Sequence, residues 1–258
     1  MAFVEVEDRG SIRWVTMSSP ESKNAVPRDG WAELTAAFDT FEASEQRVLV
    51  IIGAGGDFCA GADLGADFSG SGTPAEDAEY MRLPNEAALA LHRISKPTVA
   101  AVDGVAVGAG MNLALGCDFV IASSRARFAE IFVRRGLTLD FGGTWLLPRL
   151  VGLARARDLA LTGRIVEADE ALSIGLVTSV VGPDRLEAEV AEIAEQLAAG
   201  APLAQRFIKM ALDRSVSMTF EQGLAFEEQA QTTLLGSDDF REGATAFLEK
   251  RRPKFKGR

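Results

Sequence analysis

Residues 102–118 read VDGVAVGAGMNLALGCD and contain the backbone turn that decides the fold. The run PTVAAV at 97–102 predicts the end of a buried strand, and an apolar helix is expected to begin near Gly110. Gly104 and Gly108 allow a sharp turn between them. Unpaired N–H groups and the positive dipole end at the start of that helix would favour a negative oxygen in front of them. A tight packing turn would leave the same pattern, and the spacing differs from the dinucleotide-binding G-x-G-x-x-G.

A second segment, GAGGDFCAGADL at residues 53–64, follows the apolar run VLVII at 48–52. It has the same plan, because a predicted buried strand again ends in a turn of small residues. Two such turns can bring backbone N–H groups from separate loops to one point, which is the usual construction of an oxyanion hole. The two segments together favour a site that stabilises a developing negative charge on a carbonyl oxygen.

The motifs FCAGADL and DGVAVGAGMNLALGCD together resemble the enoyl-CoA hydratase/isomerase superfamily, the crotonase fold. The similarity runs from SPESKNAV near the start to FLEKRRPKFKGR at the end, and is closest in motif to the 1,2-epoxyphenylacetyl-CoA isomerase-like and dienoyl-CoA isomerase-like members. It implies an α/β fold, the crotonase (ClpP-like) spiral of ββα units, with residues 1–195 as the spiral core and 196–258 as a C-terminal helical trimerisation region. In this family two N–H groups hold the thioester carbonyl, and their positions match Ala62 and Ala109.

Composition narrows the class of protein further. The chain has 258 residues, a hydrophobic fraction of 47% and a formal net charge of −10. An acidic balance argues against nucleic-acid and anionic-membrane surfaces, which depend on clustered Lys and Arg. No apolar run approaches the roughly 20 residues that span a bilayer, and the start MAFVEVEDRG lacks a signal-peptide pattern, so a cytoplasmic location is expected. Cys59 and Cys117 show no metal-ligand spacing and are predicted to be buried thiols.

Hydrophobic periodicity predicts the remaining elements. Alternation around Arg9-Gly10 predicts a β-hairpin, apolar steps of three and four predict amphipathic helices, and the C-terminal third is expected to be almost all helix. A stretch rich in Gly, Ser and Asp at 65–73 predicts a mobile loop, which in the resembling family lines the acyl pocket. The predicted hairpin strands are 2–8 and 11–17, further strands are 48–52, 98–102, 118–122 and 176–181, and the main helices are 27–43, 74–94, 219–235 and 238–249.

The resemblance also implies which residue is the catalytic base. Hydratases of the family use two glutamates, and the matching positions hold Asn112 and Phe132, which cannot take a proton from water. Asp140, in GLTLDFGGTW, matches the aspartate that is the acid/base in the epoxide and dienoyl isomerases. An apolar setting between Phe132 and Trp145 should raise its pKa. From the residues alone, capping the next helix is the commoner role for such an aspartate.

Two other ionisable residues near these motifs are predicted to be structural. Glu130 lies two residues before the second glutamate position and is expected to be further from the carbonyl. His92 is the single histidine, and LHRISKPTVAAV places it at the end of a helix, on the side away from both turns. It is therefore interpreted as a packing residue rather than a catalytic one.

Coenzyme A is expected only as part of the substrate, with no separate cofactor and no metal. Phe247 and Lys250 match residues that reach the ligand of a neighbouring subunit, so the resemblance implies a homotrimer or a hexamer made of two trimers. Neither nucleic acid nor a membrane is expected as a partner. The residues predicted to contact the acyl-CoA are Lys23, Ala25, Ala60, Asp63, Leu64, Asn112, Phe132, Trp145, Phe247 and Lys250.

These features favour an acyl-CoA isomerase that shifts a double bond, or rearranges a ring, with one aspartate as acid/base. Three other functions remain open at this stage. Asp140 could orient water in an enoyl-CoA hydratase, which is a lyase of fatty acid metabolism, or could be the nucleophile of a hydrolase or dehalogenase. The chain could also be a catalytically silent acyl-CoA-binding paralogue.

Overall fold

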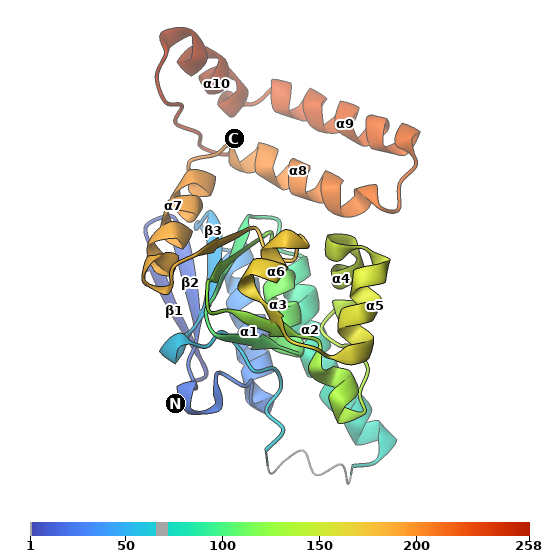
Figure 1. Ribbon diagram of the computed structural model, residues 1–258. Coiled ribbons are helices and arrows are strands. Elements are labelled where there is room, and N and C mark those ends of the chain that lie inside the picture. Colours follow the sequence, from blue (N-terminus) through green and yellow to red (C-terminus); the bar gives the residue numbers. More distant parts are fainter. Residues whose placement is uncertain (1, 66–71) are drawn as a thin grey trace.

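The computed structural model describes residues 2–65 and 72–258, and residues 66–71 of the predicted acyl-pocket loop lie outside them. The described residues form two sheets surrounded by helices (Figure 1). The strands are β1 (Val4–Arg9), β2 (Ile12–Met17), β3 (Val48–Gly53), β4 (Thr98–Val102), β5 (Val105–Val107), β6 (Phe119–Ser123), β7 (Arg127–Ala129), β8 (Val166–Glu167) and β9 (Ser179–Val181). The helices are α1 (Arg28–Glu42), α2 (Pro74–His92), α3 (Ala109–Leu115), α4 (Gly143–Val151), α5 (Leu153–Thr162), α6 (Ala168–Ser173), α7 (Leu186–Ala198), α8 (Pro202–Ser215), α9 (Phe220–Leu235) and α10 (Asp238–Glu249).

The larger sheet has the order β1-β2-β3-β4-β6-β9. Its first pair is the predicted antiparallel hairpin, closed where Arg9 pairs with Ile12, and the other neighbours in this sheet are parallel. Alternation along each strand sends side chains to opposite faces. Ile12 and Trp14 of β2 pack in the cluster that includes α7, whereas Val15 and Met17 pack in the cluster that includes α1. The sheet is therefore buried between helices on both faces, as its parallel strands require.

The smaller sheet, β5-β7-β8, was not predicted, because its strands are only two or three residues long. It begins directly after β4, at a turn that only glycine fits. Gly104 has φ +53°, and a Cβ there would lie 2.3 Å from Asp57 Oδ1. That oxygen accepts the Val105 N–H at 2.8 Å, so the turn after β4 is fastened to the turn after β3.

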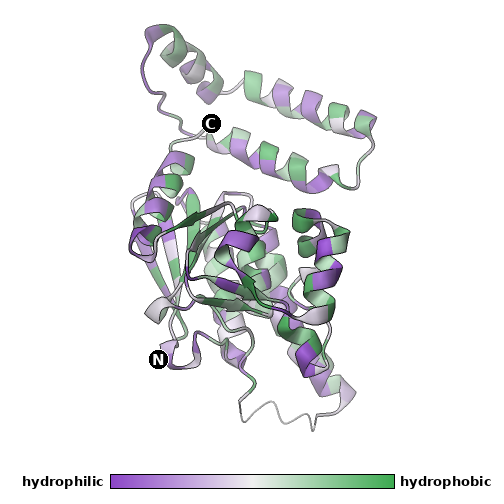
Figure 2. Ribbon diagram, in the orientation of Figure 1, coloured by the Kyte–Doolittle hydropathy of each residue, from purple (hydrophilic) through white to green (hydrophobic). Residues whose placement is uncertain are grey.

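Helices α8, α9 and α10 form a layer beyond the core (Figure 1). The predicted helices near 219–235 and 238–249 are confirmed as α9 and α10. Lys209 Nζ on α8 lies 2.7 Å from Asp118 Oδ2 and so fastens this layer to the core. Hydrophobic and hydrophilic residues alternate along α8 and α9 (Figure 2), and the exposed apolar ones include Ile208, Leu212 and Phe220. None of the helices described is long and apolar enough to cross a membrane.

Candidate active site

The two glycine-rich turns predicted from the sequence lie against each other. Cys59 forms a parallel bridge with Ala106, and Val107 N–H donates to Cys59 O at 3.1 Å. Two glycines permit this approach. A Cβ on Gly110 would lie 2.3 Å from Cys59 O, and one on Gly61, where φ is +90°, would lie 3.0 Å from Val107 O. The close contact of the two turns therefore depends on the absence of side chains at these positions.

Ala62 and Ala109 supply the two backbone N–H groups predicted to face a carbonyl oxygen. Ala109 is the first residue of α3, so its N–H has no acceptor within the helix. Ala62 follows Gly61 in a segment held by Val26, whose N–H donates to Gly61 O at 2.8 Å. In the described part of the chain, the hydrogen bonds include none donated by the Ala62 or Ala109 N–H. Both donors are thus available to a ligand.

Asn112 and Phe132 both lie beside this turn, as their predicted positions require. Phe132 is buried, and a Cβ on Gly108 would lie 3.6 Å from its ring carbon Cζ. Asn112 lies three residues after Ala109 on α3, which places it near the same face of the helix. Its amide is fully buried and donates to the Asp140 carbonyl at 3.0 Å. The two positions that hold glutamates in the resembling hydratases therefore carry a phenyl ring and an amide already engaged with the Asp140 turn.

Asp140 does not cap the helix that follows it, so the capping alternative is wrong. Helix α4 has Gly142 as its N-cap and no side-chain capping bond, because the turn is closed by Gly143 N–H donating to the Asp140 backbone carbonyl at 2.9 Å. Oδ1 of Asp140 is buried without a hydrogen-bond partner. Burial raises the pKa of its carboxyl to about 6. Asp140 is thus a half-buried residue with one buried, unpaired carboxyl oxygen, a setting compatible with an acid/base.

The backbone after Asp140 is in a strained conformation. Phe141 has φ +47°, which is unusual for a residue with a side chain. Its buried ring packs against Trp31, with ring centroids 5.7 Å apart. Packing therefore holds the chain in a conformation that local preference disfavours, at the point where the chain passes from Asp140 into α4.

Glu130, which is predicted from the sequence to be structural, lies within the site. It is fully buried, its Oε2 accepts the Asn112 amide at 3.4 Å, and its Oε1 is buried without a partner. The pKa of Glu130 is raised to about 8, mainly by burial, with the Asn112 hydrogen bond lowering it and the charge of Asp140 raising it. A carboxylate within the apolar run FAEIF was the available signal. Glu130, Asn112 and Asp140 thus form one buried polar cluster.

This cluster predicts how the stability of the protein depends on pH. Folded Glu130 and Asp140 have raised pKa values, about 8 and about 6, so the folded state binds more protons than the unfolded chain once the pH exceeds the ordinary values. Stability should therefore fall as pH rises from about 5 towards 8, by at most about 1.4 kcal/mol per pH unit for each proton. Thermal melts of wild type and Glu130→Gln across this range check it. The Gln variant should show a shallower decline, and an equal decline would exclude Glu130 as its source.

The residues predicted to contact coenzyme A near the turn at 53–64 lie on two neighbouring segments of the chain. Ala60 N–H donates to Lys23 O at 3.0 Å, and Ala25 is buried beside them. The Lys23 ammonium lies 3.4 Å from Asp57 Oδ2. Asp63 accepts the Gly65 N–H at 3.0 Å, so its carboxylate caps the local turn. Leu64 next to it is exposed.

Phe247 and Lys250 are not brought to this site within one chain. Phe247 lies on α10 and Lys250 at its C-terminal end, in the outer layer of helices away from α3 and α4 (Figure 1). Phe247 is 83% exposed. Their assignment to the ligand of a neighbouring subunit stays a prediction.

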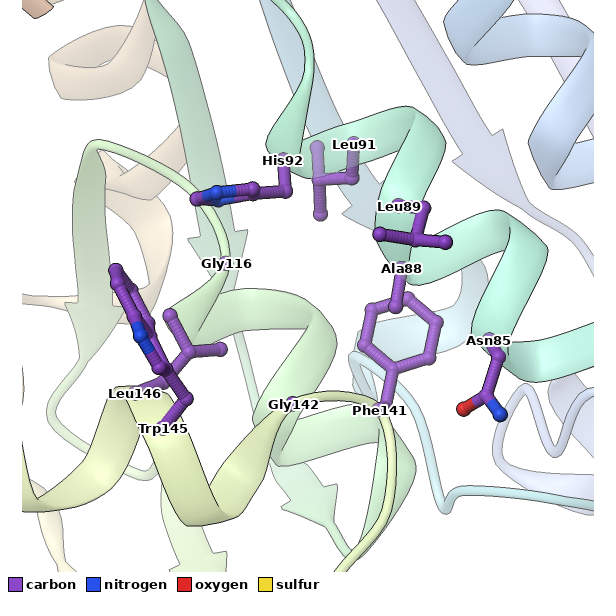
Figure 3. Close-up of a pocket in the computed structure, with 10 residues that line it drawn as sticks. All are labelled: Asn85, Ala88, Leu89, Leu91, His92, Gly116, Phe141, Gly142, Trp145 and Leu146. Carbon is purple, nitrogen blue, oxygen red and sulfur yellow. The ribbon is translucent and has the colours of Figure 1, made fainter. Parts of the chain in front are cut away.

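Trp145 and His92 lie on a cavity of ≈ 440 Å³ between α2 and α4 (Figure 3). His92 is the last residue of α2, and its ring contacts the Trp145 ring edge-on at a centroid distance of 5.4 Å. The cavity includes Gly116, at the C-terminal end of α3, whereas Ala109 begins that helix. His92 thus lies exposed at the end of α2, and it lines this cavity together with Trp145, whereas Asp140 is not among the lining residues.

No cluster of three or more His, Cys, Asp or Glu side chains suited to a metal ion occurs in residues 2–65 and 72–258. Both thiols are buried, which raises the pKa of Cys59 and of Cys117 to about 12. The polar groups that the structure places at this site include two backbone N–H donors and the carboxyl groups of Glu130 and Asp140.

Known proteins match this chain over nearly its whole length. A family model described as enoyl-CoA hydratase/isomerase matches residues 7–258. The short-chain-enoyl-CoA hydratase of Clostridium acetobutylicum is 37% identical over 96% of this chain and 95% of its own length. The 1,2-epoxyphenylacetyl-CoA isomerase of Escherichia coli is 36% identical over 100% of both chains. The crystal structure of an enoyl-CoA hydratase from Polaromonas sp. JS666 superposes with a TM-score of 0.94 at 34% identity, over 98% of this chain and 99% of that one.

Proposed function

Because the chain belongs to the enoyl-CoA hydratase/isomerase family and has the crotonase fold, we propose that it is an acyl-CoA isomerase with Asp140 as its single acid/base. One observation carries the proposal. Asp140 has a buried carboxyl oxygen without a partner, whereas Asn112 and Phe132 hold the two positions at which the resembling hydratases carry glutamates. A base is thus present for proton transfer at carbon, and the usual pair for activating water is not.

The proposed reaction needs only one base. The thioester oxygen accepts the Ala62 and Ala109 N–H groups, which makes the proton at Cα of a 3-enoyl-CoA more acidic. Asp140 takes that proton, and the electron pair spreads over the dienolate with its charge on the oxygen. Asp140 then returns the proton to Cγ, which moves the double bond to the 2-position. An aspartate whose pKa is raised to about 6 is ionised at neutral pH and is a stronger base than an exposed one.

Hydration is the second candidate, because the relatives include enzymes named as enoyl-CoA hydratases. It would require Asp140, with or without Glu130, to orient the attacking water. Ring rearrangement remains a variant of the isomerase proposal, supported by the similarity to the 1,2-epoxyphenylacetyl-CoA isomerase.

Proton exchange in deuterated water separates the candidates. Purified protein should convert a 3-enoyl-CoA to the 2-enoyl-CoA and introduce deuterium at Cα and Cγ, followed by NMR, with no 3-hydroxyacyl product. Accumulation of 3-hydroxyacyl-CoA from the 2-enoyl substrate would instead establish the hydratase. Binding of both thioesters without any exchange would point to the catalytically silent alternative.

The C-terminal helices supply the proposed assembly surface. Exposed apolar side chains there include Leu212, Phe220, Phe247 and Leu248, and Phe247 is predicted to reach a neighbouring active site. Apolar area of this kind is typical of a surface that another protein chain covers. We propose a homotrimer, or a hexamer of two trimers, in which these helices pack against copies of the same chain.

A further inference from the structure

Three buried oxygens of the site cluster lack hydrogen-bond partners among the described residues: Asn112 Oδ1, Glu130 Oε1 and Asp140 Oδ1. The first two belong to side chains that already share one hydrogen bond, from Asn112 Nδ2 to Glu130 Oε2. Buried polar atoms in folded proteins are almost always paired. Two unpaired acceptors on one interacting pair of side chains therefore call for an explanation.

The orientation of the Asn112 amide is fixed by its other contact. A backbone carbonyl can only accept, so the amide edge 3.0 Å from the Asp140 carbonyl is the Nδ2 side. The amide also packs on Gly143, where a Cβ would lie only 2.4 Å from Nδ2. The Asn112 oxygen is consequently the atom that needs a donor, and an ionised Glu130 has none to offer.

We propose that Glu130 is a neutral carboxylic acid that donates Oε1–H to Asn112 Oδ1 and thereby positions Asp140. This proton gives both unpaired oxygens a hydrogen-bond partner. Together with the Asn112 Nδ2 to Glu130 Oε2 bond, it forms a cyclic pair of hydrogen bonds between the acid and the amide. The pair holds the Asn112 amide on the Asp140 carbonyl and leaves Asp140 Oδ1 as the free acceptor. This role rests on the proposed function, in which Asp140 carries the proton.

The electrostatic surroundings favour the neutral acid. Glu130 is fully buried, and no salt bridge among the described residues involves it or Asp140. Asp140 is the charged group that acts on it, and it raises the pKa of Glu130 in addition to burial. Of the other charged neighbours, Arg134 and Arg135 lie on the 3₁₀ helix Ile131–Arg135 that follows Glu130, and both are exposed. Asp158 of α5 pairs with Arg164. Two ionised carboxylates here would have no compensating cation.

Two substitutions at residue 130 separate a positioning acid from an ionised base. Glu130→Gln keeps a donor and an acceptor, so an amide pair can replace the acid–amide pair, and kcat should stay within about threefold of wild type. Glu130→Ala removes both bonds and should lower kcat by about 10-fold or more with little change in KM, because the Asp140 turn loses its support. The matched control is Glu167→Gln at an exposed glutamate.

The pH dependence of kcat distinguishes the proposed proton on Glu130 from a purely structural role, which would leave the pH profile unchanged. Wild-type kcat should decline above pH about 8, where Glu130 loses its proton, and Glu130→Gln should lack that decline. A Gln variant as inactive as the Ala variant, or an unchanged alkaline limb, would overturn the proposal, because Glu130 would then act as a carboxylate.

Infrared spectroscopy tests the proton on Glu130 without turnover. At neutral pH the wild-type protein should show the carbonyl stretch of a protonated carboxylic acid, shifted by ¹³C-glutamate labelling and lost as the pH passes about 8. Absence of that band would contradict the proposal even if the variants failed to fold. If the band is present and no isomerisation is found, the proposed function has failed while the state of Glu130 stands.

Discussion

Replacing Asp140 by asparagine should lower kcat for double-bond isomerisation by at least about 10²-fold. The amide keeps the shape of the side chain but cannot accept a proton from Cα of the substrate. Acyl-CoA affinity should change little, since the proposed binding contacts lie elsewhere and the Asp140 backbone carbonyl still accepts the Asn112 amide. Steady-state kinetics with a 3-enoyl-CoA, together with calorimetric binding of a non-reactive acyl-CoA, measures both quantities.

The control for this substitution is Asp39→Asn, at an exposed aspartate of α1. Wild type and control should share a decline of kcat/KM below pH about 6, where Asp140 becomes protonated. Turnover by Asp140→Asn at the wild-type rate would remove Asp140 from the mechanism and leave the oxyanion turns without an identified base.

Replacing Ala109 by proline should reduce kcat by about 10²–10³-fold, the usual effect of losing one oxyanion donor. Proline has no N–H, and its ring would occupy the space in front of the donor. The fold should tolerate it, because Ala109 is the first residue of α3, where proline is favoured, and the preceding Gly108 has no Cβ to clash. Activity and a thermal melt of the same preparation distinguish lost catalysis from lost structure.

Ala109→Gly is the matched variant that keeps the N–H. It should retain most of the activity, with some loss of stability from the added backbone freedom. If the proline variant folds and turns over normally, the thioester oxygen is not held at the start of α3, and the proposed polarisation of the carbonyl is wrong.

Much of the fold was predictable because it depends on local sequence patterns. Alternation around Arg9-Gly10 predicted the hairpin, and the β-branched run before Gly53 predicted a buried strand. The glycines at 104, 108 and 110 marked a turn whose positive φ values and close contacts exclude larger residues. These features depend on neighbours in sequence, or on backbone conformations that few residue types adopt. The crotonase fold itself came from the resemblance of these motifs to a family.

The short strands β5, β7 and β8 could not be predicted in the same way. With two or three residues each, they have no period to detect, and they exist because the segments after β4 and β6 are brought side by side. The capping alternative for Asp140 also depended on tertiary structure. Local preference favours a helix cap at Asp140. In the structure, the turn at Gly142 and Gly143 closes through backbone hydrogen bonds, and Oδ1 of Asp140 has no hydrogen-bond partner.

The sequence by itself located the two turns of small residues at strand ends, and the resemblance of their motifs to a family assigned the N–H donors to Ala62 and Ala109. It also determined the absence of the glutamate pair, since residue identity alone decides that Asn112 and Phe132 are not bases. Only the tertiary structure shows the contacts on which the proposed role of Glu130 rests. Its contact with Asn112 spans 18 residues of chain, and that of Asn112 with Asp140 spans 28. The protonation of a carboxyl group is set by burial and by the donors and charges around it, which exist only once the chain has folded.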